Sequence, residues 1–258
     1  MSDTQTTVLP DAAALAAAAA GEFVLRLLGI QAARGHATAV LTGGGIGTAL
    51  LEAVAEDPDV GRVDWAEVSL WWGDERFLPD GDPERNETGA RGALARWRRV
   101  DGVGLDPSNV HPMPAADGPA GGDVHAAAAA YGAELAAAAL TDPGTVEGLP
   151  ALDVVLLGLG PEGHVASLFP PETLGGRVED PAPGVIAVTD SPKPPPVRTS
   201  LTLGALCAAE EVWLLAAGVE KAAAVAGARR DPERTPAGQV HGHRLTRWWL
   251  DTAAASRT

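Results

Sequence analysis

The strongest candidate for acid–base chemistry is His164, which stands in a glycine-rich segment behind the most apolar run of the chain. The run 152–157 reads LDVVLL, and the segment 158–170 reads GLGPEGHVASLFP. A histidine near its ordinary pKa can take a proton from water at neutral pH. Glu162 stands two residues before it and can stabilise the imidazolium that forms. A lone histidine is more often structural, but its place in a glycine loop after a strand predicts His164 as a general base.

The same segment contains the GxGxxG spacing of dinucleotide-binding loops, over 158–163. That motif needs a long helix after its third glycine and an acidic residue at the end of the next strand. Only six residues separate Gly163 from Pro170, and the acids that follow, Glu179 and Asp180, stand in a stretch rich in Pro and Gly. The context therefore predicts no nucleotide cofactor.

A glycine cluster and an arginine indicate a phosphate site. Gly43, Gly44 and Gly45 stand between a predicted strand and a predicted helix, where backbone amides and the helix dipole attract an anion. The plainer interpretation is a tight turn that needs glycine. Arg76 follows another predicted strand and can bind phosphate through two N–H groups, while Asp74 can orient a neighbour or a sugar hydroxyl. An ordinary polar loop with a salt bridge is the alternative there.

Two further cations stand in the segment 191–198, SPKPPPVR. Its prolines restrict the backbone and would hold Lys193 and Arg198 in place, and two positioned cations suit a phosphate dianion. The alternative is a polyproline ligand for a partner domain or a rigid spacer. The place of the segment between two predicted strands favours the phosphate site.

A metal centre is not predicted. Cys207 is the single cysteine of the chain, which excludes an internal disulfide framework and a multi-cysteine metal site. His241 and His243 could chelate an ion, but no acid or cysteine at a matching spacing accompanies them. We predict catalysis without a metal or a redox cofactor.

The apolar pattern predicts a scaffold that brings these loops together. Expected helices cover 11–34, 48–55, 83–99, 123–140 and 220–229, and expected strands cover 38–41, 68–72, 152–157, 185–188 and 212–216. This alternation predicts an α/β fold, with a mostly parallel, Rossmann-like sheet, helices on both faces and a few additional strands. The stretches 101–122 and 170–184 are predicted as surface loops, so residues 1–258 are expected to form one domain. Active sites of such sheets lie beyond the carboxyl ends of the strands, where the candidate residues stand.

Charge and composition limit the partners of the protein. The formal net charge of −15 argues against binding to nucleic acid or to an anionic membrane surface. No apolar stretch is expected to reach the length needed to cross a membrane, because the longest ones are interrupted by Gly, Glu or Arg, and the first residues lack the pattern of a secretory signal. We expect a cytoplasmic protein, a monomer or small homo-oligomer, whose partner is a small molecule.

Taken in order, the segments WGDER (72–76), GHVASLFP (163–170) and SPKPPPVR (191–198) resemble the 6-phosphogluconolactonase family. The tail 245–255 looks like the family's closing strand and helix. The resemblance implies a fold like that of glucosamine-6-phosphate deaminase and ribose-5-phosphate isomerase. It also implies a metal-free hydrolysis in the oxidative pentose phosphate pathway, with His164 as the base.

Three positions depart from the pattern of that family. Residues 45–47 (GIG) stand where the loop Ser-Gly-Gly-Ser-Thr-Pro usually ends, which removes a hydroxyl contact to phosphate. Glu162 replaces the usual Asp, and Arg85 replaces the serine that commonly precedes Asn86.

Together these features predict hydrolysis of 6-phospho-D-glucono-1,5-lactone to 6-phosphogluconate, with water activated by His164 attacking the lactone carbonyl. One alternative is an aldose–ketose isomerase or amino-sugar phosphate deaminase of the same fold. Those deaminases typically continue Gly-His with Ile-Ala-Phe-Asn-Glu-Pro, whereas this chain continues with VASLFP. The other alternative is a noncatalytic sugar-phosphate sensor, which is expected to carry a DNA-binding segment.

Overall fold

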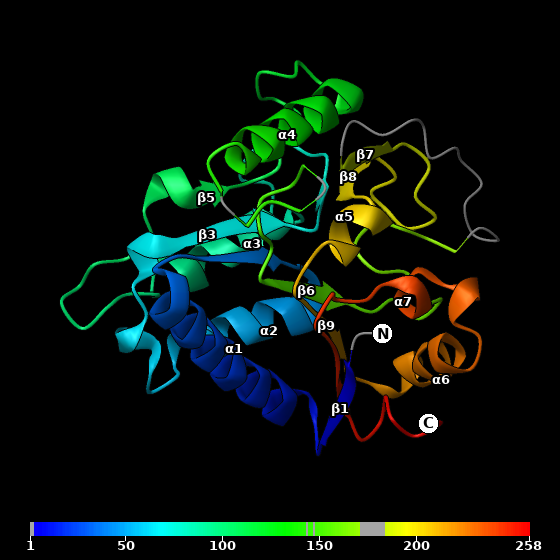
Figure 1. The fold of residues 1–258 in the computed structure, drawn as a ribbon. Coiled ribbons are helices and arrows are strands. Elements are labelled where there is room, and N and C mark those ends of the chain that lie inside the picture. The colour runs from blue at the N-terminus through cyan, green and yellow to red at the C-terminus, as the bar shows by residue number, and fades with distance from the viewer. Residues whose placement is uncertain (1–2, 143, 147, 171–183) are drawn as a thin grey trace.

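The computed structural model describes residues 3–142, 144–146, 148–170 and 184–258. Its centre is a seven-stranded sheet in which all neighbouring strands run parallel (Figure 1). In spatial order its strands are β1 (Asp3–Leu9), β10 (Leu245–Asp251), β9 (Glu211–Ala216), β6 (Val154–Gly158), β2 (Ala37–Leu41), β3 (Val68–Trp72) and β5 (Val110–His111).

A smaller antiparallel sheet lies beside the first. It consists of β4 (Asp74–Arg76), β8 (Arg198–Leu201) and β7 (Val185–Val188), in that order. The prediction of a mostly parallel sheet with a few additional strands is therefore confirmed.

Helices cover both faces of the large sheet. On one face α1 (Ala12–Arg34) packs against α2 (Gly44–Ala55), which packs against α3 (Asn86–Leu94) (Figure 1). On the other side lie α4 (Val124–Ala139) and α5 (Leu203–Cys207), and α4 contacts β7 and β8 of the small sheet. The remaining helices, α6 (Ala222–Arg230) and α7 (Pro236–Gln239), follow β9 and contact each other.

Helix α1 begins where expected, because the Asp11 side chain accepts a hydrogen bond from the amide of Ala14 at 2.9 Å and so caps the helix. By length and composition α1 could span a membrane, so the expectation that no apolar stretch is long enough is wrong for this segment. In the fold its side chains Leu15, Phe23 and Leu27 are fully buried. The helix therefore behaves as a core helix of a globular protein.

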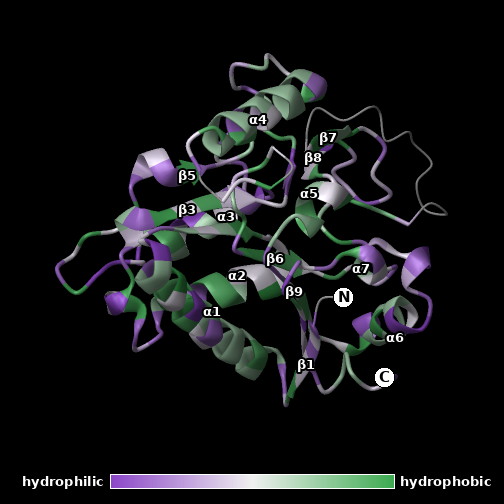
Figure 2. Ribbon diagram, viewed as in Figure 1, coloured by the Kyte–Doolittle hydropathy of each residue, from purple (hydrophilic) through white to green (hydrophobic). Residues whose placement is uncertain are grey.

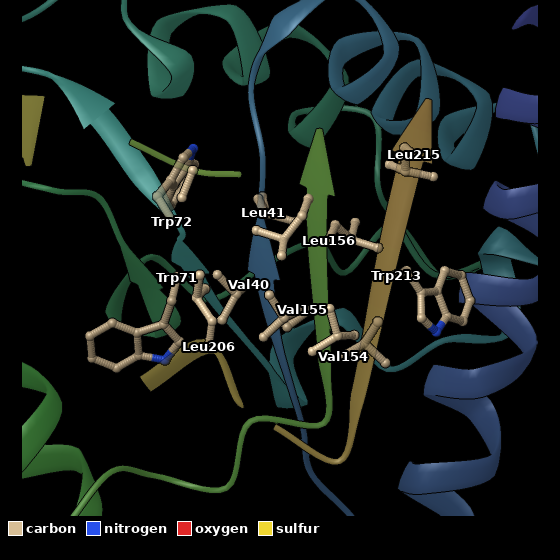
Figure 3. Close-up of a cluster of buried hydrophobic side chains, with 14 of the residues drawn as sticks. Val40, Leu41, Trp71, Trp72, Val154, Val155, Leu156, Leu206, Trp213 and Leu215 are labelled. Atoms are coloured by element: carbon tan, nitrogen blue, oxygen red, sulfur yellow. The ribbon is translucent and has the colours of Figure 1, made fainter. Parts of the chain in front are cut away.

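The core lies on both faces of the parallel strands (Figure 3). Trp213 faces α1, where its ring meets that of Phe23 at 6.4 Å. Trp71 lies on the opposite face, where its ring meets that of Tyr131 from α4 at 5.6 Å. Figure 2 shows hydrophobic residues concentrated in β6, β9 and α2. Because the core covers both faces of these strands, the central strands are continuous apolar runs.

Several element boundaries differ from the predictions. Strand β1 was not predicted, because its sequence DTQTTVL is mostly polar and lies exposed at the sheet edge. Helix α2 begins at Gly44 rather than at 48, and α3 is shorter than the predicted 83–99. Residues 252–257 form turns and not the closing helix that the resemblance implies. The predicted loop 170–184 lies for the most part outside the described residues.

The order of the strands creates a crevice between β2 and β6. From β2 the chain moves to β3 and β5 on one side, whereas from β6 it moves to β9 and β10 on the other. The loops that leave the carboxyl ends of β2 and β6 therefore diverge, which is where ligands bind in open parallel sheets. The amide of Gly158 donates a hydrogen bond to Thr42 Oγ1 at 3.2 Å and joins the two strand ends at the floor of this crevice.

Candidate active site

A cleft of about 650 Å³ opens at this crevice. Loops that follow the carboxyl ends of β2, β3, β6 and β9 line it, together with the proline-rich segment before β8. The structure brings to this cleft all but one of the predicted site residues: Gly43, Gly44, Gly45, Asp74, Arg76, His164, Lys193 and Arg198. The remaining one, Glu162, contacts two of them.

His164 lies at one wall of the cleft between Glu162 and Phe169. Its Nδ1 lies 3.1 Å from Oε1 of Glu162, and its ring centre lies 4.5 Å from that of Phe169. The imidazole lies so close to Gly160 that a Cβ there would stand 1.9 Å from Nδ1, so this position requires glycine. Burial lowers the pKa of His164 below its usual value, although the Glu162 carboxylate opposes the shift. The imidazole is therefore neutral at pH 7 and able to accept a proton.

Glu162 connects the histidine to a lysine. Its Oε2 accepts a hydrogen bond from Nζ of Lys193 at 3.0 Å, while Oε1 faces His164. Burial alone would raise the pKa of Glu162, but hydrogen bonds and the charges of His164 and Lys193 lower it overall. Glu162 therefore carries a negative charge beside the imidazole over the physiological range.

The glycine cluster forms the start of α2. Gly43 is the residue before the first turn, and Gly44 and Gly45 are inside it. The first amides of a helix have no partners within it, and the positive end of the helix dipole adds to their attraction for an anion. Because α2 begins four residues earlier than predicted, these amides lie at the cleft itself, as a phosphate cradle requires.

Asp74 and Arg198 belong to a buried hydrogen-bonded group. Oδ2 of Asp74 accepts from the Ser167 hydroxyl at 2.6 Å, and that hydroxyl lies 3.4 Å from Nη1 of Arg198. The rest of the Arg198 guanidinium donates to the carbonyls of Lys193, Pro194 and Pro195 at 3.0–3.2 Å. These contacts hold the proline-rich segment in place and leave Arg198 few N–H groups for a ligand.

Arg76 differs from Arg198 in its free hydrogen-bonding capacity. Its Nη1 donates to the carbonyl of Glu84, while its Nε is buried and lacks a partner among the described residues. Arg76 also lines the cleft. Of the two arginines, Arg76 therefore has the geometry better suited to bind a phosphate.

Sequence reasoning missed two charged residues of the cleft, Glu220 and Lys221, in a short 3-10 turn after β9. Burial is the main cause that lowers the pKa of Lys221, and the nearby charge of Lys193 acts in the same direction. Lys193 and Lys221 thus bring two ammonium groups to one cleft of a strongly acidic protein. The signal was available, since Lys221 follows the carboxyl end of a predicted strand as the other candidates do.

No group of three or more His, Cys, Asp or Glu side chains in the described part of the chain is arranged to hold a metal ion. The pair that could chelate one is divided: Nδ1 of His241 lies 3.0 Å from the Gln239 carbonyl and 3.5 Å from Sγ of Cys207. His243 is exposed and contributes its amide to a bond with the Ala209 carbonyl.

The chain is similar to known proteins over nearly its whole length. Residues 10–249 match the family model described as glucosamine-6-phosphate isomerases/6-phosphogluconolactonase. The chain is 52% identical over 260 residues to a 6-phosphogluconolactonase of Streptomyces coelicolor, covering 100% of this chain and 96% of that protein. It is 46% identical over 252 residues to a 6-phosphogluconolactonase of Mycobacterium tuberculosis, covering 97% and 96%.

The fold agrees with these sequence relationships. The solved structure of 6-phosphogluconolactonase from Trypanosoma cruzi superimposes with a TM-score of 0.78 at 26% identity, covering 99% of this chain and 97% of that one. Both the family model and the two bacterial relatives extend over nearly the whole sequence. The chain therefore belongs to the family of glucosamine-6-phosphate isomerases and 6-phosphogluconolactonases.

Proposed function

We propose that the protein hydrolyses 6-phospho-D-glucono-1,5-lactone to 6-phosphogluconate, the reaction of the oxidative pentose phosphate pathway. The observation that carries the proposal is the meeting, in one cleft, of a neutral, partly buried histidine, a charged carboxylate beside it and several anion-binding groups. The names of the relatives that match over nearly the full chain support the choice of substrate.

His164 is the general base of the proposed reaction. An N–H at Nδ1 facing Glu162 leaves Nε2 as the acceptor for a proton of water. As the proton moves, a bond forms between the water oxygen and the lactone carbonyl carbon, and the π electrons of the carbonyl move onto its oxygen until they return to expel the ring oxygen. The resulting imidazolium is stabilised by the negative charge of Glu162, and it can then donate the proton to the ring oxygen as the ester bond breaks.

The phosphate anchor consists of groups that carry or focus positive charge. Arg76, Lys193, Lys221 and the amides of Gly44 and Gly45 line the cleft, and they suit a dianion. Anchoring the phosphate would hold the reacting carbonyl near the histidine and convert binding energy into positioning. A net charge of −15 gives no long-range attraction for such a substrate, so these local groups must supply the affinity.

Hydrolysis of freshly generated lactone tests the proposal directly. The native protein should accelerate acid release well above the spontaneous rate in a pH-stat, and His164→Ala should lose most of that acceleration. His243→Ala is the matched control, because His243 is exposed and lies outside the cleft. A native protein that leaves the spontaneous rate unchanged contradicts the proposed function.

The proposal includes a cytoplasmic enzyme that acts as a monomer or small homo-oligomer, without nucleic acid or membrane as a partner. The single cysteine and the acidic net charge support this choice. Light scattering on the purified protein measures the oligomeric state, and a large assembly would contradict it.

A further inference from the structure

We propose that Asn86 is a positioning residue of the active site, whose carboxamide sets the distance between the glycine loop at Gly43 and the carboxylate of Asp74. The kinetic part of this inference rests on the proposed function. The packing part, the contact between Asn86 and Gly43, does not rest on that function, because the stability of variants tests it without any activity measurement.

The first contact is with the glycine loop. A Cβ built on Gly43 would lie 1.8 Å from Oδ1 and 2.9 Å from Cβ of Asn86, so the asparagine occupies the space of a side chain at position 43. Gly43 has φ −91° and ψ −159°, which any residue can adopt, so its backbone conformation does not itself require glycine. The requirement for glycine at position 43 therefore comes from Asn86.

The second contact is with Asp74. Nδ2 of Asn86 donates to the Asp74 carbonyl at 2.8 Å and to its Oδ1 at 3.2 Å, and Asn86 itself lines the cleft. The other oxygen of that carboxylate accepts from Ser167, and the nearest guanidinium, that of Arg198, lies 4.0 Å away. One carboxamide thus touches both the start of the phosphate cradle and the carboxylate of Asp74.

Asn86 can fix the positions of Gly43 and Asp74 because its own backbone is held in place by the Glu75 carboxylate. Glu75 has no exposed surface, and its carboxylate accepts from the amides of Arg76, Asn86 and Glu87 at 2.7–2.9 Å. Arg85 lies on the other side of this carboxylate at 3.7 Å. The Arg85 side chain also donates to the carbonyls of Leu78 and Met113, at 3.1 and 2.8 Å. The first turn of α3 is therefore fixed to β4, which carries Asp74.

A double-mutant cycle tests the packing step. Gly43→Ala should lower the denaturation midpoint strongly in the native background and much less in the Asn86→Gly background, where the clashing atoms are absent. Gly45→Ala is the matched control, because a Cβ at position 45 meets nothing within 4 Å, and it should have a small effect in both backgrounds. Equal losses from Gly43→Ala in both backgrounds, or failure to fold in both, would overturn the proposal.

The kinetic step is tested with Asn86→Asp, which keeps the shape but replaces the donor to Asp74 with a second carboxyl oxygen. We expect kcat to fall about tenfold or more at neutral pH with little change in KM, because positioning is lost rather than binding. Two adjacent carboxyl groups share a proton as the pH falls, which restores a hydrogen bond. The ratio of variant to native kcat should therefore rise toward pH 5.

Asn109→Asp is the matched control for the kinetic step. Nδ2 of Asn109 donates to the Ala66 carbonyl at 2.7 Å, and the residue lies outside the active-site cleft. Its kcat ratio should stay near one and independent of pH. A ratio for Asn86→Asp that is also near one, or that is low but constant with pH, would overturn the positioning role. If the native protein shows no lactone hydrolysis, the proposed function fails, and the stability cycle still decides whether Asn86 positions Gly43.

Discussion

Glu162 and His164 follow β6, and Lys193 contacts Glu162 from the proline-rich segment before β8; these three side chains are 20%, 15% and 37% exposed. On the β4 side, the side chains of Asp74 and Arg198 are 9% and 5% exposed. The first three, which we term the β6 wall, are linked through the Glu162 carboxylate. The second pair, together with Asn86 and Ser167, forms the β4 wall, in which each polar group has fixed partners in the protein.

This difference separates two tasks that one active site must perform. A group that exchanges protons with water or contacts a substrate must keep some access to the cleft, as those of the β6 wall do. A group that fixes geometry is better buried, because a buried hydrogen bond is costly to break. Substitutions in the β6 wall should therefore change rate or affinity, and those in the β4 wall should also change stability.

The largest effect is expected for the base of the β6 wall. His164→Ala should lower kcat by about 10²–10⁴-fold, because the variant can no longer take a proton from water. The melting temperature and the affinity for 6-phosphogluconate, measured by calorimetry, should change little. A kcat close to that of the native enzyme would show that His164 is not the base and that the division between the walls is wrong.

The two arginines provide the sharpest contrast. Arg198→Ala removes the partner of three carbonyls and the nearest cation to Asp74, so it should lower the free energy of unfolding by about 2–4 kcal/mol. Arg76→Ala should leave stability nearly unchanged, yet weaken 6-phosphogluconate roughly tenfold and leave unphosphorylated gluconate unaffected. Denaturant titration and calorimetry on both variants measure these quantities. If both variants lose only affinity, Arg198 is a phosphate ligand and the β4 wall is not purely a positioning element.

A smaller effect is expected for the partner of the base. Glu162→Gln removes a charge that raises the pKa of His164, so that pKa should fall further below its usual value. A base is active when deprotonated, so the acid limb of kcat/KM should lie below pH 6.5 in the native enzyme and move to still lower pH in the variant. At neutral pH the variant should lose about tenfold in kcat, since the imidazolium is less stabilised. A limb that stays in place or moves upward would exclude this role for Glu162.

No effect at all is expected from metal removal. Because a histidine base needs no Lewis acid to activate water, dialysed enzyme in EDTA should hydrolyse the lactone at its full rate. Added NADP should show no saturable binding by calorimetry. Loss of activity in EDTA that one divalent ion restores would contradict this prediction and would indicate a metal site near His241 and His243.

The sequence predicted the features whose causes are local. Strand β6 could be recognised because it is an uninterrupted apolar run, and α1 because Asp11 caps a long alanine-rich segment. Strand β1 could not, since an edge strand with polar residues on its exposed side has no apolar period, and its threonines were the one available signal. The exact start of α2 was also missed, because its first residues include three glycines, which have low helix propensity.

The sequence predicted which residues form the candidate site, but it did not predict the role of each residue. Charged residues after the carboxyl ends of parallel strands must gather at one edge, which explains why the predicted residues share a cleft. Arg198 is engaged by carbonyls because the proline-rich segment folds back on itself, whereas Nε of Arg76 has no partner among the residues that the structure describes. The role of Asn86 depends on a contact with Gly43 between distant segments, and no local pattern reports such a contact.

The pairing of β1 with β10 has a consequence for how the chain acquires its structure during synthesis. Asp3 lies opposite Leu245, and residues as far apart as Gln5 and Arg247 are hydrogen-bonded across a separation of 242 positions. The ribosome synthesises β1 early and β10 very late. Strand β1 therefore remains unpaired until β10 has been synthesised. Pairings this distant close slowly, and an unpaired strand is prone to associate with other chains in the interval. The polar, threonine-rich sequence of β1 lowers this risk, because an apolar strand that stays unpaired is more prone to aggregate.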